Sequence, residues 1–212
     1  PYVNHPIRTA QFLAEMELQL PIVIAGLLHD VPEDTEVTLD EIKKEFGDDV
    51  WSIVQGVTKI GKVKYRGVAR YVENVRKFFI AMAEDSRSLI VKFADRIDNL
   101  RTLDAHPPKK QYRIALESLE IFAPIANRLG MGEIKGEIED LAFKYVYPKE
   151  YEWAKAIIEE RYAQKQEYIA KVMDITKKEL IRADVSIIKM DGRLKHLFSL
   201  YKKLEKHDRD IT

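Results

Sequence analysis

The sequence predicts an all-α bundle of helices, followed by a helical linker and by the first strand and helix of an α/β unit. Apolar side chains recur every three or four positions along most of the chain, which is typical of amphipathic helices. Residues that start and end helices separate these stretches. The pattern changes at residues 185–188, Val-Ser-Ile-Ile, which are typical of a short β-strand. We therefore expect three parts, at residues 1–147, 148–183 and 184–212, of which the last is incomplete.

Composition excludes several classes of function. The chain has 35 Lys and Arg residues against 35 Asp and Glu residues, so net charge gives no support to binding of nucleic acid or of an anionic membrane. It has no cysteine, which excludes disulfides, thiolate metal sites and cysteine nucleophiles. No apolar run approaches the ~20 residues that span a bilayer, and no signal-peptide pattern opens the chain. We expect a cytoplasmic protein and, because it begins with Pro1, a piece of a longer one.

The first two helices lead up to a group of polar residues. An apolar stripe over residues 7–16 predicts a helix with Pro6 in its first turn, which places His5 at the helix entrance, where its ring can point into a cleft. A second helix at residues 22–30 is apolar nearly all round and is therefore expected to be buried. Pro32 lacks a backbone N–H and disfavours helical geometry at the preceding residue, so this helix should end or kink there.

The middle of the chain continues the helical pattern. Thr38 and Glu41 form a capping box that starts a short helix ending at Gly47, with another helix after it. Residues 58–70 are a glycine-containing basic loop whose cations could either meet phosphate or remain solvated. Residues 71–84 are again predicted to be helical.

The helix predicted at residues 86–103 carries a polar side as well as an apolar stripe. Asp95, Asp98, Asn99 and Thr102 cluster on the polar side. Periodicity by itself favours an ordinary surface helix here. It also makes Asp95 and Asn99 neighbours one turn apart, so that both could address one site.

The remaining helices have weaker chemical signals. Residues 109–129 predict a long helix that Pro124 should kink. Residues 133–145 are helical, and residues 148–182 are interpreted as an exposed amphipathic helical pair. Helical pattern returns at residues 193–204.

The strongest chemical signal is the segment in which the second predicted helix ends. His29 and Asp30 offer a nitrogen and an oxygen ligand to one metal ion, a mixed set that suits Mn or Fe, with Zn also possible. Glu33 and Asp34 could position or deprotonate a water held by that ion. Acidic residues after a buried helix can equally form a solvated loop, and the dipeptide alone leaves both interpretations open.

Five segments together resemble one family. They are residues 1–6 (PYVNHP), 28–35 (LHDVPEDT), 57–60 (VTKI), 91–102 (VKFADRIDNLRT) and 123–130 (APIANRLG). In this order and spacing they resemble the hydrolase half of the RelA/SpoT homologues, long bifunctional enzymes that make and destroy the alarmone (p)ppGpp. The similarity covers nearly the whole chain. It implies an HD-domain helical bundle, named after the His-Asp pair of the wider HD phosphohydrolase superfamily.

The resemblance assigns roles to particular residues. The implied ligands of a Mn²⁺ ion are His5, His29, Asp30 and Asp95. The implied catalytic pair is Glu33 and Asp34, which would position or deprotonate the attacking water. The implied contacts to the nucleotide are Asn99 and Thr102, and a basic rim for its phosphates would include Lys59, Lys62 and Arg66.

The implied reaction is hydrolysis of the 3′-pyrophosphate of ppGpp or pppGpp, giving GDP or GTP and pyrophosphate, in the stringent response. Two alternatives remain: a catalytically weak nucleotide-binding regulatory domain of an alarmone synthetase, or an HD phosphohydrolase that acts on another nucleotide. Residues 192–203 resemble the opening of the family's synthetase domain, whose acidic catalytic residues would follow Thr212 in cis. No direct nucleic-acid or membrane partner is implied for this fragment.

The chain departs from the family's pattern in three places. Asp98 stands where the family commonly has His and adds negative charge near an anionic substrate. Pro32 stands where a second Val is common and should alter the geometry between ligand and base. The family's Arg-Lys-Ser-Gly segment, whose Arg packs on the guanine, would lie just before Pro1.

Overall fold

A computed structural model of the chain describes residues 3–61, 76, 78–80, 83–190, 192 and 196–206. Its α-helices are α1 (Asn4–Glu15), α2 (Leu20–Leu28), α3 (Val31–Asp34), α4 (Leu39–Gly61), α6 (Arg87–Arg101), α7 (Pro108–Glu117), α8 (Ala123–Arg128), α9 (Gly132–Val146), α10 (Pro148–Arg182) and α11 (Leu197–Lys206). A 3-10 helix, η1 (Leu103–Ala105), and a π-helix, η2 (Ser118–Phe122), join some of them. None of the helices in this described part is long and apolar enough to cross a membrane.

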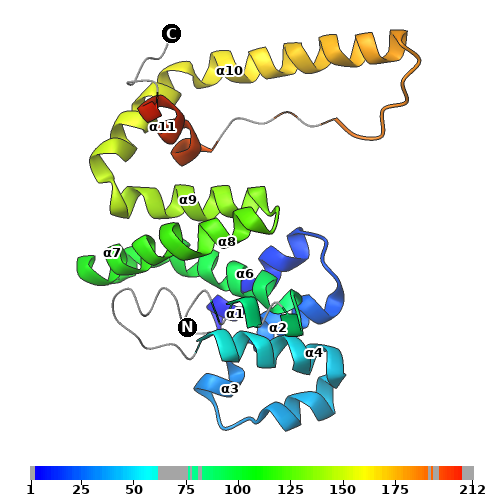
Figure 1. Cartoon of the computed structure of the whole chain (residues 1–212), viewed down its shortest axis with the longest axis vertical. Helices are drawn as coiled ribbons and strands as arrows, with labels where there is room; N and C mark the ends of the chain where they lie inside the picture. The colour runs from blue at the N-terminus through cyan, green and yellow to red at the C-terminus, as the bar shows by residue number, and fades with distance from the viewer. Residues whose placement is uncertain are drawn as a thin grey trace. The chain divides into compact units, whose positions relative to one another are not determined.

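The chain divides into two compact units, Pro1–Ala142 and Phe143–Thr212. In the first unit α6 packs against α1, α2 and α4 (Figure 1). Their apolar faces meet in one core that includes Leu13, Ala25 and Ile53, all fully buried. Burial of that core, rather than helix propensity alone, is what holds helices of this length together in water. The core therefore fixes the helices that carry the residues discussed below.

Two predicted helix boundaries are confirmed in α4. The Thr38 backbone N–H donates to Glu41 Oε2 at 2.8 Å, and the Glu41 N–H donates to Thr38 Oγ at 3.3 Å, which is the reciprocal capping box. Gly47 interrupts the helix with φ of 85° and ψ of 175°, a conformation that glycine reaches without steric cost. The helical chain thus changes direction at Gly47, as the sequence predicts.

The predicted end of the second helix before Pro32 is also confirmed. Helix α2 ends at Leu28, and the short helix α3 starts at Val31 with Pro32 in its first turn. A proline there loses no hydrogen bond, because the first N–H groups of a helix have no partner within it. Pro32 therefore separates two helices and leaves His29 and Asp30 at the junction between them.

Periodicity by itself favours an ordinary surface helix at residues 86–103, and it misses the burial of part of the polar side of this helix. Asp95 and Asp98, on its polar side, are only 5% and 2% exposed. Helix α1 covers this side, because His5 and Arg8 of α1 contact Asp98. Periodicity separates a polar side from an apolar one, but it does not show whether water or another polar helix lies against the polar side.

The predicted kink at Pro124 takes the form of a change of helix type. Helix α7 runs into the π-helix η2, and α8 begins at Ala123 with Pro124 in its first turn. Pro124 has no N–H to offer to the preceding turn, and a wider π-turn is one of the known ways in which a helix accommodates such a gap.

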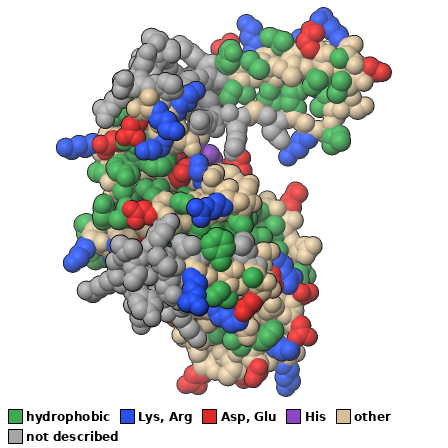
Figure 2. Space-filling model, viewed as in Figure 1, with side chains coloured by type: hydrophobic (Ala, Val, Ile, Leu, Met, Phe, Trp, Pro, Cys, Tyr) green, Lys and Arg blue, Asp and Glu red, His purple; other side chains and the backbone are tan. Residues whose placement is uncertain are grey.

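The second unit differs from expectation in two respects. Residues 148–182 form one helix of 35 residues, α10, and not a helical pair. Exposed apolar side chains lie along α10 (Figure 2), among them Tyr168, Ile175 and Ile181. The small core of this unit joins α10 to α11 around Phe143.

The strand predicted at residues 185–188 is wrong, so the described residues give no support to the α/β unit that it was expected to open. These residues are irregular, and Ile188 is fully exposed. A β-strand needs a neighbouring strand to pair its backbone N–H and C=O groups, and the described residues contain none. β-Branched side chains alone therefore do not make a strand here.

The close approach of α4 to α6 predicts an effect on stability. A Cβ atom at Gly56 would lie 2.8 Å from Ser88 Cβ, and Ser88 is held in place because its hydroxyl donates to the Ile53 carbonyl. Gly56→Ala should lower the free energy of unfolding by about 1–3 kcal/mol in urea titrations, because the two helices must move apart. Gly132→Ala, where the methyl group would meet open space, is the control and should leave the free energy of unfolding unchanged. Equal stability of both variants would contradict the prediction.

Candidate metal centre

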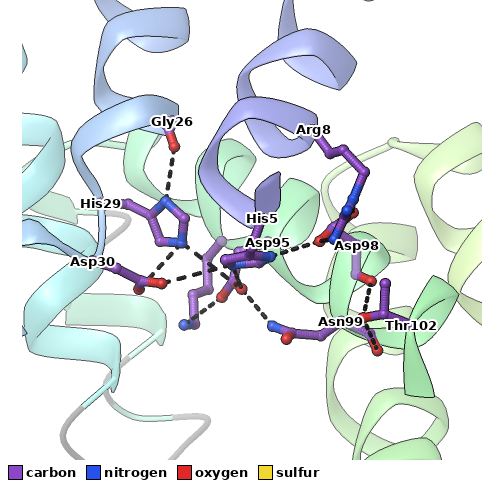
Figure 3. A network of polar contacts seen from close by, with 10 residues as sticks. His5, Arg8, Gly26, His29, Asp30, Asp95, Asp98, Asn99 and Thr102 are labelled. Atoms are coloured by element: carbon purple, nitrogen blue, oxygen red, sulfur yellow. Dashed lines mark hydrogen bonds and ion pairs between the residues drawn. The ribbon is translucent and has the colours of Figure 1, made fainter. Parts of the chain in front are cut away.

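Polar side chains from three helices converge at the junction of α2 and α3. His5 belongs to the first turn of α1, His29 directly follows α2, and Asp95 lies on α6 (Figure 3). Ligand atoms of His5, His29 and Asp30 lie within 4.8 Å of one another. Asp95 Oδ1 lies 3.3 Å from His5 Nε2 and 3.9 Å from His29 Nε2. The structure thus brings together the four residues that the resemblance implies as metal ligands.

His29 presents a nitrogen lone pair to this cluster. Its side chain is fully buried, and Nδ1 lies 2.8 Å from the Gly26 carbonyl oxygen. A carbonyl can only accept, so Nδ1 carries a proton, and in the neutral ring Nε2 is the nitrogen with the lone pair. Nε2 lies 3.2 Å from Asp30 Oδ1, yet this buried nitrogen has no hydrogen-bond donor. A buried acceptor without a donor is costly in a folded protein, and a metal cation is the partner that fits it.

His5 faces the cluster through its other ring nitrogen. Nε2 lies 3.3 Å from Asp95 Oδ1 and 3.6 Å from Asp30 Oδ2, while Nδ1 bonds to Asp98 Oδ2 at 2.6 Å. The hydrogen bond with Asp95, partly opposed by burial and reinforced by Asp98, raises the pKa of His5 to about 9. At neutral pH His5 is therefore protonated, and its positive charge compensates the neighbouring carboxylates of Asp95 and Asp98. A bound divalent cation would compensate them in its place.

Asp95 is held as an anion by its neighbours on α6. Lys92 Nζ lies 2.7 Å from Asp95 Oδ2, and the Asn99 side-chain amide donates to Oδ1. Burial alone would raise the pKa of Asp95, but Lys92 and His5 hold it well below its usual range. Sequence reasoning did not assign a role to Lys92, although its position three residues before Asp95 on a helix was a usable signal.

The proposed catalytic pair lies on α3, directly beyond Asp30. The backbone N–H groups of Glu33 and Asp34 donate to the Asp30 carbonyl at 3.0 and 2.9 Å. These bonds tie the short helix to the residue that is implied to bind the metal. Both side chains are exposed, so water can reach them. The assignment of catalytic roles to them stays a prediction.

The implied nucleotide contacts lie along one edge of the cluster. Asn99 is exposed, which a residue must be in order to contact substrate. Its side-chain amide also donates a hydrogen bond to Asp95 Oδ1. Thr102 Oγ donates to the Asp98 carbonyl at 3.0 Å. Lys59 is paired with Glu84 at 2.7 Å, while Lys62 and Arg66 lie outside the described residues. The basic rim therefore stays a prediction.

The donor set fits a divalent cation. Two imidazole nitrogens and carboxylate oxygens are ligands that suit Mn, Fe and Zn, and the missing cysteines leave no thiolate to favour a softer ion. Together with the unpartnered Nε2 of His29, this chemistry supports a metal site. His5, His29, Asp30 and Asp95 are the residues that would hold the ion.

Comparisons with known proteins agree with this geometry. A GTP pyrophosphokinase of Streptomyces coelicolor is 44% identical over 212 residues, which are 100% of this chain and 25% of the relative. A guanosine-3′,5′-bis(diphosphate) 3′-pyrophosphohydrolase of Aquifex aeolicus is 44% identical over 204 residues, 96% of this chain and 29% of the relative. The bifunctional (p)ppGpp synthase/hydrolase SpoT of Escherichia coli is 40% identical over 205 residues, which are 96% of this chain and 29% of the relative. The chain thus spans about a quarter to a third of the relatives it matches.

Residues 1–132 match the protein family described as HD domain. This range is more than half of the chain and contains all four residues of the cluster, including the His29-Asp30 pair. An HD domain implies a divalent metal ion, which agrees with the chemistry of the donor set. The chain therefore belongs to the HD-domain family, in the branch formed by the RelA/SpoT homologues.

Proposed function

We propose that this chain catalyses the metal-dependent hydrolysis of the 3′-pyrophosphate of (p)ppGpp, giving GDP or GTP and pyrophosphate, in the stringent response. The observation that carries the proposal is the buried Nε2 of His29, which has no hydrogen-bond partner and faces His5, Asp30 and Asp95. Relatives named 3′-pyrophosphohydrolases support the substrate and the reaction. We assign Mn²⁺ as the metal, the ion that the resemblance implies.

The proposed reaction adds water across one bond. Oxygen of water bonds to the phosphorus attached to the 3′ oxygen, the bond between that phosphorus and the 3′ oxygen breaks, and the 3′ oxygen ends with a proton. When bound, the metal ion supplies Lewis-acid activation of water and substrate near neutral pH. Asp95, held by Lys92 and Asn99, presents its anionic side chain in a fixed orientation. Glu33 and Asp34 position the water and take its proton.

The rest of the substrate is bound around this centre in our proposal. Asn99 and Thr102 contact the nucleotide, and Lys59, Lys62 and Arg66 neutralise its phosphates. Lys59 must exchange its pairing with Glu84 for that contact. Residues 1–147 form the hydrolase domain, residues 148–183 a linker and residues 184–212 the beginning of a synthetase domain in cis. We place the reaction in the cytoplasm.

A second candidate function has one specific observation in its favour. Some relatives are named GTP pyrophosphokinases, including the one of Streptomyces coelicolor. In such a protein the HD domain could bind nucleotide and regulate synthesis without turnover. The convergence of all four implied ligands favours the hydrolase, since a domain without turnover has no need of them. An HD phosphohydrolase for another nucleotide would be recognised by faster turnover of that nucleotide in a substrate panel.

Removal of a proposed ligand should abolish activity. Asp30→Asn and Asp95→Asn keep the size of the side chain but remove the charge, and each should lower ppGpp hydrolysis with Mn²⁺ by more than about 100-fold. Release of pyrophosphate is measured with and without Mn²⁺. Glu137→Gln, which alters an ion pair with Arg101 on the same unit, is the control and should retain activity. Full activity in either Asp variant would exclude the proposed site.

Glu33 should affect turnover without affecting metal binding. Glu33→Gln removes a proton acceptor that is not among the ligands, so kcat should fall by roughly 10²–10⁴-fold while the Kd for Mn²⁺ stays unchanged. Single-turnover hydrolysis and calorimetric titration with Mn²⁺ give the two quantities. Glu36→Gln changes a nearby exposed carboxylate and should leave both as they are. Unchanged turnover in Glu33→Gln would remove this residue from the mechanism.

Metal uptake should release a proton from His5. Because the pKa of His5 is raised to about 9, the folded protein is protonated there at pH 7, and a cation must displace that proton before Nε2 can bind it. Affinity for Mn²⁺ should therefore rise about tenfold from pH 7 to pH 8. Calorimetry in buffers of different ionisation enthalpy should detect about one proton per ion at pH 7. Affinity that is independent of pH in this range would contradict the role of His5.

A further inference from the structure

We propose that Asp98, fixed by Arg8, is a positioning residue that orients His5 toward the metal and does so without adding net negative charge to the site. The inference rests on the proposed metal-dependent function. It concerns a residue that the resemblance leaves without a role, and it assigns to Arg8 a role that neither motif nor spacing indicated.

The contacts of Asp98 use both of its oxygens. Oδ2 accepts a hydrogen bond from His5 Nδ1 at 2.6 Å, and the Arg8 guanidinium donates from Nε to Oδ1 at 2.6 Å and from Nη2 to Oδ2 at 2.9 Å (Figure 3). The Asp98 side chain is almost fully buried beneath these two partners. A bidentate contact of this kind fixes the plane of the carboxylate as well as its position.

This arrangement determines which nitrogen of His5 faces the metal position. A carboxylate can only accept, so His5 Nδ1 is a donor and Nε2 points away from Asp98 toward Asp30 and Asp95. A carboxylate on the far nitrogen of a metal-binding histidine holds the ring and makes the near nitrogen a better electron donor. His29 has a neutral carbonyl in the equivalent place, so the two imidazoles are oriented by different acceptors.

Arg8 cancels the electrostatic cost of this carboxylate. A buried anion beside a site for a polyanionic substrate would repel that substrate. The Arg8 guanidinium lies on the same carboxylate and donates to both of its oxygens, so its positive charge lies directly against the negative charge of Asp98. The Arg8–Asp98 pair therefore orients His5 with no net charge, and the negative charge expected from Asp98 is compensated within the protein.

A similar pair elsewhere on the first unit shows what a structural role looks like. Arg87 donates from Nε and Nη2 to Asp85, whose other partner outside the pair is the Ser52 hydroxyl. This pair lies at the N-terminal end of α6, roughly 16 Å along the helix from Asp98 by the rise per residue. It has the same ionic chemistry but no histidine, and it serves as the matched control.

The test measures affinity for Mn²⁺ by calorimetry on the whole chain. Asp98→Asn should weaken binding by about 10–100-fold, the loss typical of removing the carboxylate partner of a ligating histidine. Arg8→Ala should weaken it by about 3–10-fold, since the carboxylate remains but loses its fixed orientation. The double variant should bind like Asp98→Asn alone, because Arg8 acts through Asp98. Asp85→Asn should bind like the unaltered chain.

A spectroscopic signal separates positioning from loss of structure. The electron paramagnetic resonance spectrum of bound Mn²⁺ should change in Asp98→Asn and stay unchanged in Asp85→Asn, while circular dichroism should show that both are folded. If Asp98→Asn does not fold, the affinity of Arg8→Ala for Mn²⁺ decides the question, because the Arg8 side chain is 42% exposed.

Three outcomes would overturn the inference. They are unaltered Mn²⁺ affinity in Asp98→Asn, additive losses in the double variant, and an equal loss in Asp85→Asn. An unaltered chain that binds Mn²⁺ but does not hydrolyse ppGpp refutes only the proposed function, and the affinity series still decides the role of Asp98. An unaltered chain that binds no Mn²⁺ refutes both.

Discussion

The first unit depends on one constraint: polar atoms that its apolar core encloses must find partners. Helices α1, α2 and α4 pack around α6 through a core that includes Leu13, Ala25 and Ile53. This packing buries His29 and Asp95. Hydrogen bonds satisfy most of the enclosed atoms, but three side-chain atoms among the described residues have no partner: Thr9 Oγ1, Arg96 Nε and His29 Nε2. Of these, His29 Nε2 faces the carboxylates of Asp30 and Asp95. The helices thus create a site for a cation as a consequence of how they pack, since an unpartnered buried acceptor is otherwise a cost to stability.

The two histidines meet this constraint in different ways. His29 is oriented by a backbone carbonyl of its own helix, so its orientation is settled as soon as α2 forms. His5 is oriented by Asp98, which lies 93 residues away along the chain, so its orientation requires that α1 and α6 have already packed. Metal binding at this centre is therefore coupled to the tertiary structure through His5, and only weakly through His29.

The second unit has only a small apolar core. That core is built from Phe143, Ala154 and Tyr201, and much of the apolar surface of α10 is exposed. A core of that size stabilises a long helix over only part of its length. Residues 185–188 show the same limit, because side chains suited to a strand remain irregular when no neighbouring strand is present among the described residues.

The sequence by itself determined the local features: the capping box at Thr38, the break at Gly47 and the separation of two helices before Pro32, all of which depend on residues a few positions apart. It also indicated His29 and Asp30 as ligands, because adjacent residues at a helix end can be recognised without knowing the fold. Only the tertiary structure decided that Asp95 and Asp98, on the polar side of α6, are buried and that Arg8 neutralises Asp98. Periodicity shows which residues share a side of a helix. What packs against that side depends on residues distant in the chain, and so do the charge and orientation of the groups buried there.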